Sequence, residues 1–355
     1  MHLNRNVIKP LLISLCISLL CLALTGCNVS FSVGGSSTSS CQSNCASGSG
    51  VQGVHIYVEP DDGESVITGA IKSASKSVWL EIYILTDRNV IRALEEAANH
   101  GLDVRVMLEP HPVGGGSSVS RTLDELKAAG VNAQYTSPDF ALTHEKGMII
   151  DGSTAYIMTS NFSRSALGGS SSSSTRNREY GIIDSNPQDV QAITAIFTAD
   201  WNHTPTQFND ANLVVSPVNS RNAFMGIIGS AQHTLLIEAE EMNDSAIEQA
   251  LVSAASRGVQ IEIILPAPSG SSGDSNSQGI AAIKQSNITV REDPQLYMHA
   301  KIIVADGLKA FVGSENISTQ SLDQNRELGI LVSDATVLGK LQSTFQIDWG
   351  VSKGV

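Results

Sequence analysis

The chain has 355 residues, which is enough for about two domains of ordinary size. Hydrophobic residues make up 41% of the chain and charged residues 16%, a composition that excludes a wholly disordered or fibrous protein. The net charge of −13 has the wrong sign for a protein that coats nucleic acids regardless of their sequence, although it leaves room for local basic pockets.

The start of the chain has the pattern of a bacterial export signal. Arg5 and Lys9 precede an uncharged apolar run at residues 11–24, about 14 residues long and shorter than the roughly 20 that cross a bilayer. The run ends in Leu-Thr-Gly-Cys27, which resembles the lipobox of bacterial lipoproteins, whose cysteine is acylated. We therefore expect residues 1–26 to be a lipoprotein signal peptide. The protein would then be exported and anchored to a membrane through Cys27, on the periplasmic or cell-surface face. The alternative is an ordinary signal peptide with a coincidental cysteine.

Residues 27–52 are rich in Ser and Gly and carry few large apolar side chains, so we expect a flexible tether. Cys41 and Cys45 lie close together within it, and an oxidising compartment favours a disulfide between them. Two free thiols are the alternative. Because the sequence from residue 53 onward contains no cysteine, a thiolate zinc site is excluded from the folded body.

From residue 54, short apolar strands alternate with helical patterns. We predict strands at residues 54–58, 78–85 and 103–108. The helices between and after them are indicated by apolar residues at helical spacing, namely Ile67 and Ile71, Ile91 and Leu94, and Leu123 and Leu126. Strands separated by helices of this length predict a largely parallel sheet that helices cover on both faces.

The same order of elements recurs from residue 213. Glu81 of the first copy corresponds to Glu238 of the second, and residues 197–201 and 345–349 both read Phe-x-x-Asp-Trp. We predict a duplicated α/β domain, with an N-terminal copy at 53–205, a C-terminal copy at 206–355 and a pseudo-twofold relation between them. A chain that supplies both copies needs no partner chain, so we expect a monomer.

Each half carries one copy of the pattern His-x-Lys-x4-Asp. The first copy consists of His144, Lys146 and Asp151, and the second of His299, Lys301 and Asp306. Both copies are followed in the same order by a Ser, an Asn and an Asn-Arg-Glu triplet. The Ser, the Asn and the Glu of the triplet are Ser160, Asn161 and Glu179 in the first half and Ser314, Asn316 and Glu327 in the second. Two such series in one order lie far beyond chance expectation.

The spacing of the motif explains its chemistry. In a strand, alternate side chains point to one face, so each histidine projects together with the lysine two positions later. The ammonium group can hold an anionic oxygen while the imidazole remains available for acid, base or nucleophilic work. A lysine directed into a buried site favours an anionic ligand.

These two series resemble the phospholipase D superfamily, whose members carry two His-Lys-Asp motifs that meet at one active site. The resemblance covers residues 54–349 and implies two pseudo-symmetric domains, each a mixed, mostly parallel sheet flanked by helices. It also implies a two-step phosphodiester exchange. One histidine forms a covalent phosphohistidine, and the other protonates the leaving oxygen and then activates water. Family precedent makes His144 the nucleophile and His299 the acid and base, although the sequence itself does not rank them.

The resemblance assigns roles to the remaining motif residues. Side chains with positive charge, amide or hydroxyl groups are expected to hold the phosphoryl oxygens, and they are Lys146, Lys301, Asn161, Asn316, Ser160 and Ser314. Glu179 and Glu327 are expected to fix the tautomer of an imidazole. Asp151 and Asp306 complete the catalytic motif, and we expect them to brace the fold rather than contact phosphate. No metal or other cofactor is expected, because protein cations stabilise the charge.

The substrate is least determined by the sequence. The leading interpretation is a phospholipase D that hydrolyses phospholipid headgroup esters, because a lipid anchor would hold the enzyme beside a membrane substrate. An exported endonuclease, which would make nucleic acid the partner, and a phosphatidyltransferase with an alcohol acceptor use the same chemistry. Outside enzymology, the alternative is a surface lipoprotein that binds anionic headgroups without turnover.

Overall fold

A computed structural model describes residues 48–113, 118–169, 175–268, 274–284 and 287–355. The predicted signal peptide, most of the tether, Cys27 and the pair Cys41 and Cys45 lie outside the described residues. The described residues all belong to one compact unit. None of the helices in these ranges has both the length and the apolar character needed to span a bilayer.

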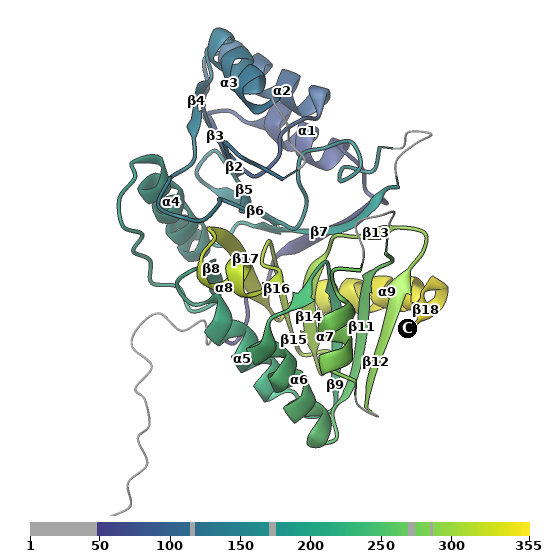
Figure 1. The fold of residues 1–355 in the computed structure, drawn as a ribbon. Coiled ribbons are helices and arrows are strands. Elements are labelled where there is room, and N and C mark those ends of the chain that lie inside the picture. The colour runs from purple at the N-terminus through teal and green to yellow at the C-terminus, as the bar shows by residue number, and fades with distance from the viewer. Residues whose placement is uncertain (1–47, 114–117, 170–174, 269–273, 285–286) are drawn as a thin grey trace, which may run out of the picture. The chain divides into compact units, whose positions relative to one another are not determined.

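The first half folds as a mixed sheet with helices packed on it (Figure 1). Its strands are β1 (His55–Glu59), β2 (Ser77–Ile82), β3 (Asp103–Leu108), β4 (Asn132–Tyr135), β5 (Lys146–Ile150), β6 (Thr154–Met158) and β7 (Asn177–Asp184). Its helices are α1 (Ser65–Ser73), α2 (Arg88–Asn99), α3 (Ser118–Ala128) and α4 (Pro187–Trp201). Across the sheet the strand order is β1-β7-β6-β5-β2-β3-β4.

The second half repeats this plan. Its main strands are β8 (Leu213–Ser216), β9 (Thr234–Ala239), β11 (Gln260–Pro266), β12 (Ile288–Asp293), β14 (Lys301–Ala305), β15 (Lys309–Gly313), β17 (Glu327–Val332) and β18 (Lys353–Gly354). Three short strands are β10 (Met242–Asn243), β13 (Tyr297–Met298) and β16 (Ile317–Ser318). The helices are α5 (Ser220–Ser230), α6 (Ser245–Ser256), α7 (Ser277–Ala282), α8 (Thr319–Asp323) and α9 (Ala335–Val351). The order β8-β17-β15-β14-β9-β11-β12 matches that of the first sheet, with β18 added beyond β12.

The mixed α/β class with two equivalent domains is confirmed, but the parallel share of each sheet is smaller than expected. Parallel pairing joins β2, β3 and β4 in the first sheet and β9, β11 and β12 in the second. Apart from β13 beside β7, the other neighbouring pairs of both sheets are antiparallel. The physical reason lies in the connections: β5–β6 and β14–β15 are joined by tight turns, and only antiparallel strands can be joined so directly.

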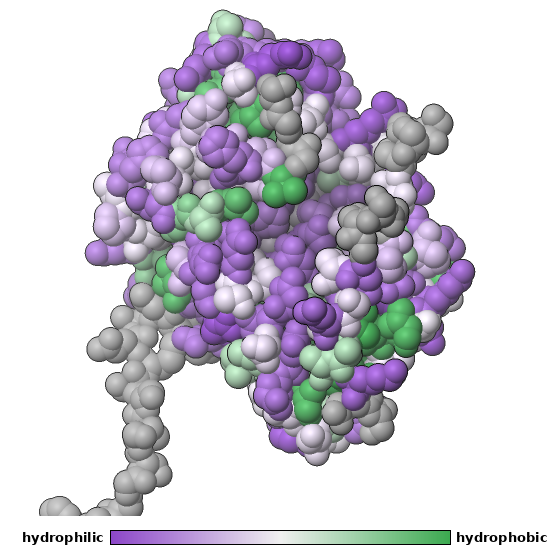
Figure 2. Space-filling model, in the orientation of Figure 1, coloured by the Kyte–Doolittle hydropathy of each residue, from purple (hydrophilic) through white to green (hydrophobic). Residues whose placement is uncertain are grey.

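The two sheets lie between outer layers of helices (Figure 1). Helices α1, α2 and α3 pack on the outer side of the first sheet, and α5 and α6 pack on the outer side of the second. The inner faces of both sheets share one core with α4 and α9, in which Ile157 and Ile302 are completely buried. Figure 2 shows that the surface facing the viewer is mostly hydrophilic, with hydrophobic residues in separate small patches.

Two buried ion pairs cross from one half to the other. Arg178 donates to Asp348 from Nε at 2.6 Å and from Nη2 at 2.8 Å. Arg326 donates to Asp200 from Nη2 at 2.9 Å. The arginines belong to the Asn-Arg-Glu triplets and the aspartates to the Phe-x-x-Asp-Trp segments, so each repeated sequence that closes one half binds the other half.

Candidate active site

Crossed backbone contacts carry each motif histidine to the opposite half. β13 directly precedes His299 and pairs with β7, so that Met298 lies opposite Arg178. In the other direction, Thr143 precedes His144 and forms a parallel bridge with Arg326. Each histidine therefore enters the site beside the Asn-Arg-Glu triplet of the other half.

The glutamates of these triplets orient the imidazoles across the boundary between the halves. His144 Nδ1 lies 2.9 Å from Glu327 Oε2, and His299 Nδ1 lies 2.8 Å from Glu179 Oε1. Both carboxylates are completely buried. A carboxylate beside Nδ1 holds a proton on that nitrogen, which leaves Nε2 as the reacting atom. The sequence predicted that Glu179 and Glu327 bind imidazoles, but it did not indicate that the pairs are crossed.

Both histidines line one cleft of about 380 Å³. Polar residues from both halves share this lining, and those nearest the motifs are Tyr83, His144, Asn161, Glu240, His299 and Asn316. The carbonyl oxygens of the Asn161 and Asn316 amides have no hydrogen-bond partner among the described residues. The cleft thus brings together the two histidines and the two asparagines that the sequence singled out.

The two motif lysines lie buried directly beneath the histidines. Lys146 Nζ donates to the carbonyl of His144 at 2.5 Å, and Lys301 Nζ donates to the carbonyl of His299 at 2.7 Å. Burial lowers the pKa of Lys146 to about 7. Because a phosphate anion would stabilise the charged ammonium, this lysine suits a site that fills with an anionic ligand.

His144 is held in its neutral form. Burial lowers its pKa to about 4, and the charge of Lys146 adds to this effect against the opposing influence of Glu327. A neutral imidazole with its proton on Nδ1 presents a free electron pair on Nε2, which is the form needed for nucleophilic attack.

The motif aspartates lie outside the cleft lining, although the motif groups them with the catalytic residues. Asp151 accepts hydrogen bonds from the backbone N–H groups of residues 75–77 at 2.7–3.0 Å. Asp306 binds residues 232–234 in the same way at 2.7–2.8 Å. Although burial opposes ionisation, these bonds lower the pKa of Asp151 to about 2. Both aspartates therefore brace the link between a helix and its sheet.

The two serines are also placed behind the cleft rather than in it. Ser160 and Ser314 are completely buried, and neither lines the cleft. Ser314 Oγ accepts a hydrogen bond from the backbone N–H of Leu328 at 3.0 Å. This geometry does not support the direct phosphate contact that the sequence predicted for these hydroxyls.

Among the residues that the sequence did not single out, three lie close to the motif side chains. The ring of Tyr83 packs edge-on against His144 with the centroids 4.6 Å apart. Glu240 Oε2 lies 2.8 Å from Lys301 Nζ, and Tyr297 donates its hydroxyl to Glu240 Oε1 at 3.0 Å. A signal for two of them was present in the sequence, because Tyr83 and Glu240 each follow the matched residues Glu81 and Glu238 by two positions.

One cluster of carboxylates among the described residues has the spacing of a metal site. Glu81, Glu145 and Asp200 place oxygens within 4.8 Å of one another in the core. The guanidinium of Arg326 binds Asp200 there, and burial raises the pKa of Glu145 to about 8. A protonated carboxyl group beside an arginine accounts for this cluster with the protein's own charges.

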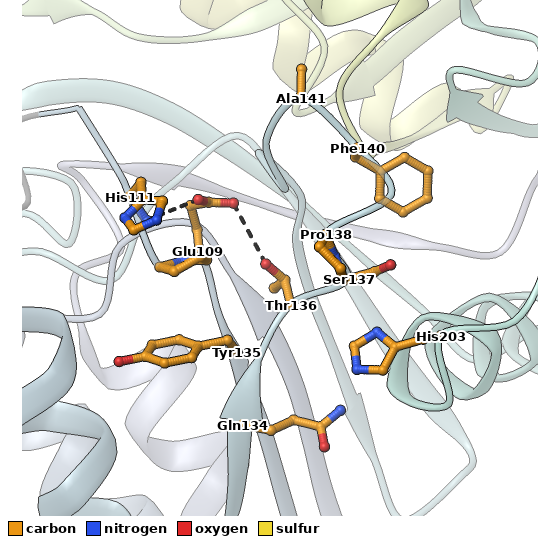
Figure 3. A pocket seen from close by; sticks show the side chains of 11 residues that line it. Glu109, His111, Gln134, Tyr135, Thr136, Ser137, Pro138, Phe140, Ala141 and His203 are labelled. Carbon is orange, nitrogen blue, oxygen red and sulfur yellow. Dashed lines mark hydrogen bonds between the residues drawn. The ribbon is translucent and has the colours of Figure 1, made fainter.

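A second cavity of about 530 Å³ lies at the ends of β3 and β4 (Figure 3). None of the motif residues line it. Its Glu109 carboxylate accepts a hydrogen bond from the His111 backbone and, through Oε2, one from the backbone N–H of Thr143 at 2.7 Å. The cavity therefore shares a wall with the segment before His144 but lacks the paired histidines and lysines of the cleft.

A duplicated α/β domain with one His-x-Lys motif per half at a shared cleft is the architecture of the phospholipase D superfamily. This chain belongs to that superfamily, because the family described as "Cardiolipin synthase, PLD-like domain" matches residues 67–201 and 224–349. The predicted superfamily is thereby confirmed.

Known proteins extend this likeness over most of the chain. "Major cardiolipin synthase ClsA" of Bacillus subtilis (strain 168) is 26% identical over 343 residues, which cover 84% of this chain and 69% of that protein. Phosphatidylserine synthase of Haemophilus influenzae Rd KW20 has a TM-score of 0.62 at 14% identity, covering 84% of this chain and 87% of the other. Polyphosphate kinase of Porphyromonas gingivalis has a TM-score of 0.67 at 17% identity, covering 85% of this chain but 48% of the kinase. At these identities the two structures show a common fold alone.

Proposed function

We propose that this protein is a phosphatidyltransferase, which moves a phosphatidyl group from a phospholipid to an alcohol through a phosphohistidine. The observation that carries the proposal is the cleft in which two histidines, each oriented by a carboxylate of the opposite half, lie above two buried lysines. The relatives named cardiolipin synthases favour transfer to an alcohol over the headgroup hydrolysis that led our sequence-based interpretation.

In the first step, His144 Nε2 attacks the phosphorus atom of the donor. A P–N bond forms, the P–O bond to the headgroup breaks, and His299 Nε2 gives its proton to the leaving alkoxide. Asn161, which lines the cleft, holds a phosphoryl oxygen, and the buried ammonium of Lys146 stabilises the redistributing charge from behind the lining, a role that depends on groups already in place.

In the second step, an acceptor hydroxyl gives its proton to His299 Nε2 while its oxygen bonds to phosphorus. The P–N bond breaks, and His144 returns to its neutral form. Water in place of the alcohol would yield phosphatidic acid. Because cardiolipin contains two phosphatidyl groups joined through glycerol, phosphatidylglycerol is the proposed donor and acceptor, and glycerol is the leaving group.

The predicted lipid anchor at Cys27 fits this proposal. A tethered enzyme would meet donor and acceptor in the same membrane at high local concentration. Export, acylation and the monomeric state remain predictions, which the mass of the mature protein and its behaviour in membrane fractions would test.

The test is an assay of the full-length protein on vesicles of phosphatidylglycerol, with products identified by mass spectrometry. We expect cardiolipin and free glycerol, and we expect the His144→Asn variant to yield neither. Phosphatidic acid as the sole lipid product would instead identify a hydrolase. Nicking of plasmid DNA without any lipid product would identify a nuclease.

A further inference from the structure

The cleft has one marked break in its twofold symmetry. In the first half, Ile82 pairs with Lys146 across the sheet, and in the second half Ala239 pairs with Lys301. The next residue along each strand reaches the cleft, and it is Tyr83 on one side and Glu240 on the other. An aromatic ring in one half thus corresponds to a carboxylate in the other.

A second position differs in the same region. The residue two places before the histidine is Leu142 in the first half and Tyr297 in the second. Tyr297 donates its hydroxyl to Glu240 Oε1 at 3.0 Å, so the carboxylate is held by a partner that the first half does not have. Glu240 and Tyr297, the two residues that differ from their counterparts in the first half, are therefore hydrogen-bonded to each other beside His299.

Glu240 lies beside the reacting nitrogen of that histidine. Its Oε2 is 3.4 Å from His299 Nε2 and 2.8 Å from Lys301 Nζ, and its side chain is 19% exposed to the cleft. Although burial opposes ionisation, His299 and Lys301 hold the pKa of Glu240 below its usual range. A negative group therefore faces the place where the acceptor hydroxyl must approach.

We propose that Glu240 is an acceptor-binding residue, which accepts a hydrogen bond from a second hydroxyl of a polyol while the first hydroxyl faces His299 Nε2. The inference rests on the proposed transferase function and names the residue that would recognise the adjacent hydroxyls of its acceptor. A carboxylate only accepts hydrogen bonds, and it is the group that proteins use to bind the hydroxyls of ribose.

The same charge separates the places of the two substrates. A phosphoryl oxygen beside Glu240 would be repelled, so the donor phosphate lies on the side of His144, where the buried Lys146 Nζ is 5.0 Å from the centroid of the Tyr83 ring. In the transfer step the proton of the first hydroxyl passes to His299 Nε2, the new O–P bond forms and the P–N bond to His144 breaks. Glu240 keeps its charge throughout and binds only the second hydroxyl.

The experiment compares two soluble acceptors that differ by one hydroxyl. Full-length protein on phosphatidylglycerol vesicles receives equal amounts of n-propanol and propylene glycol, and mass spectrometry gives the ratio of the two phosphatidyl products. We expect the wild type to prefer propylene glycol and Glu240→Gln to lower the product ratio about tenfold, the effect of losing a hydrogen bond to a charged group. Glu240→Asp should retain part of the preference.

The controls separate this role from others. Glu241→Gln removes the neighbouring cleft carboxylate and should keep the wild-type ratio. The proposal is overturned if Glu240→Gln keeps the wild-type product ratio, whether its thermal unfolding is unchanged or only its KM for the donor is altered. Glu240 would then be a structural group or a counter-ion. Should Glu240→Gln not fold, Tyr297→Phe must lower the ratio for the proposal to stand. A wild type that forms cardiolipin but does not prefer propylene glycol to n-propanol would overturn the role of Glu240 alone, whereas a wild type that forms neither alcohol product nor cardiolipin would refute the transferase function itself.

Discussion

The two halves of the molecule are most alike where they hold each other and differ beside the reacting nitrogens. Each half sends a buried glutamate to the other half's histidine and a buried arginine to the other half's closing aspartate. Beside the histidines, however, Tyr83 packs on His144, whereas Glu240 approaches His299. Duplication supplies two equal imidazoles, and their unequal neighbours can give them different tasks.

Replacing each histidine in turn is the strongest test of this division. We expect His144→Asn to abolish the covalent intermediate, since no nucleophile remains. His299→Asn should still form the intermediate from a substrate with an acidic leaving group such as p-nitrophenol, because that group leaves without protonation. A denaturing detergent quench at neutral pH after reaction with a labelled phosphatidyl group, followed by detection of labelled protein, measures both.

If the His144→Asn protein became labelled and the His299→Asn protein did not, His299 would be the nucleophile and His144 the acid and base. The wild-type protein supplies the control. Label bound through phosphohistidine should survive denaturation at neutral pH and be lost at acidic pH, whereas lipid that is bound non-covalently should be removed by denaturation alone.

The crossed carboxylates sharpen the comparison next. We expect Glu327→Gln to slow formation of the intermediate and Glu179→Gln to slow the steps that need His299, each by about 10²–10⁴-fold, because an amide does not fix the required tautomer. Rapid-quench kinetics separate formation from breakdown. A Glu327→Gln variant that forms the intermediate from a p-nitrophenyl ester at the wild-type rate would contradict the assignment of Glu327 to His144.

The buried arginines test whether the halves depend on each other for stability. Arg326→Met leaves Asp200 buried without its partner, and we expect a loss of about 3–5 kcal/mol in the free energy of unfolding. Arg178→Met should act similarly through Asp348. Denaturant unfolding measures the loss, and the double replacement of Arg326 and Asp200 by apolar residues should recover much of it.

The pH dependence distinguishes His144, the proposed nucleophile, from a histidine of ordinary pKa. Since the pKa of His144 is about 4 in the folded protein, below its usual 6.5, its neutral form predominates at neutral pH. Its contribution to stability is present above pH 6.5 and is lost as the pH falls through 4. We expect intermediate formation from the p-nitrophenyl ester to persist to about pH 5, and a midpoint near 6.5 would contradict this.

The motif aspartates should give the smallest effect. Asp151→Asn weakens the hydrogen bonds to residues 75–77, and we expect a loss of about 1 kcal/mol of stability without a change in activity per folded molecule. Asp306→Asn is the matched variant in the other half. Thermal unfolding and the transfer assay together would detect a catalytic role if one existed.

Much of the fold and site could be predicted because the chain repeats itself. Two series in one order indicated a duplicated domain, the resemblance to the phospholipase D superfamily implied one shared active site, and strand periodicity predicted that each histidine lies on the same face as its lysine. The bracing role of Asp151 also agrees with its position in a tight turn, where it has a left-handed φ of 56°.

The rest depends on contacts between distant segments. A single sequence does not indicate which glutamate meets which histidine, because that choice is made by the pairing of β13 with β7 and of Thr143 with Arg326. Glu240 was missed because it differs from its counterpart Tyr83, so the repeat does not single out this position. Ser160 and Ser314 are completely buried behind the cleft, and the sequence gives no sign of that depth; the Ser314 hydroxyl binds the backbone N–H of Leu328 instead of a ligand.

The crossed hydrogen bonds have a consequence for how this protein can be regulated or damaged. Any event that parts the two domains by a few ångströms, such as a cut in residues 202–212 followed by separation, would take the orienting carboxylate from both imidazoles at once. Catalysis should therefore vanish in a single cooperative transition, and neither domain expressed alone should retain partial turnover. Mixing the separate domains and watching activity return would then report directly on their association.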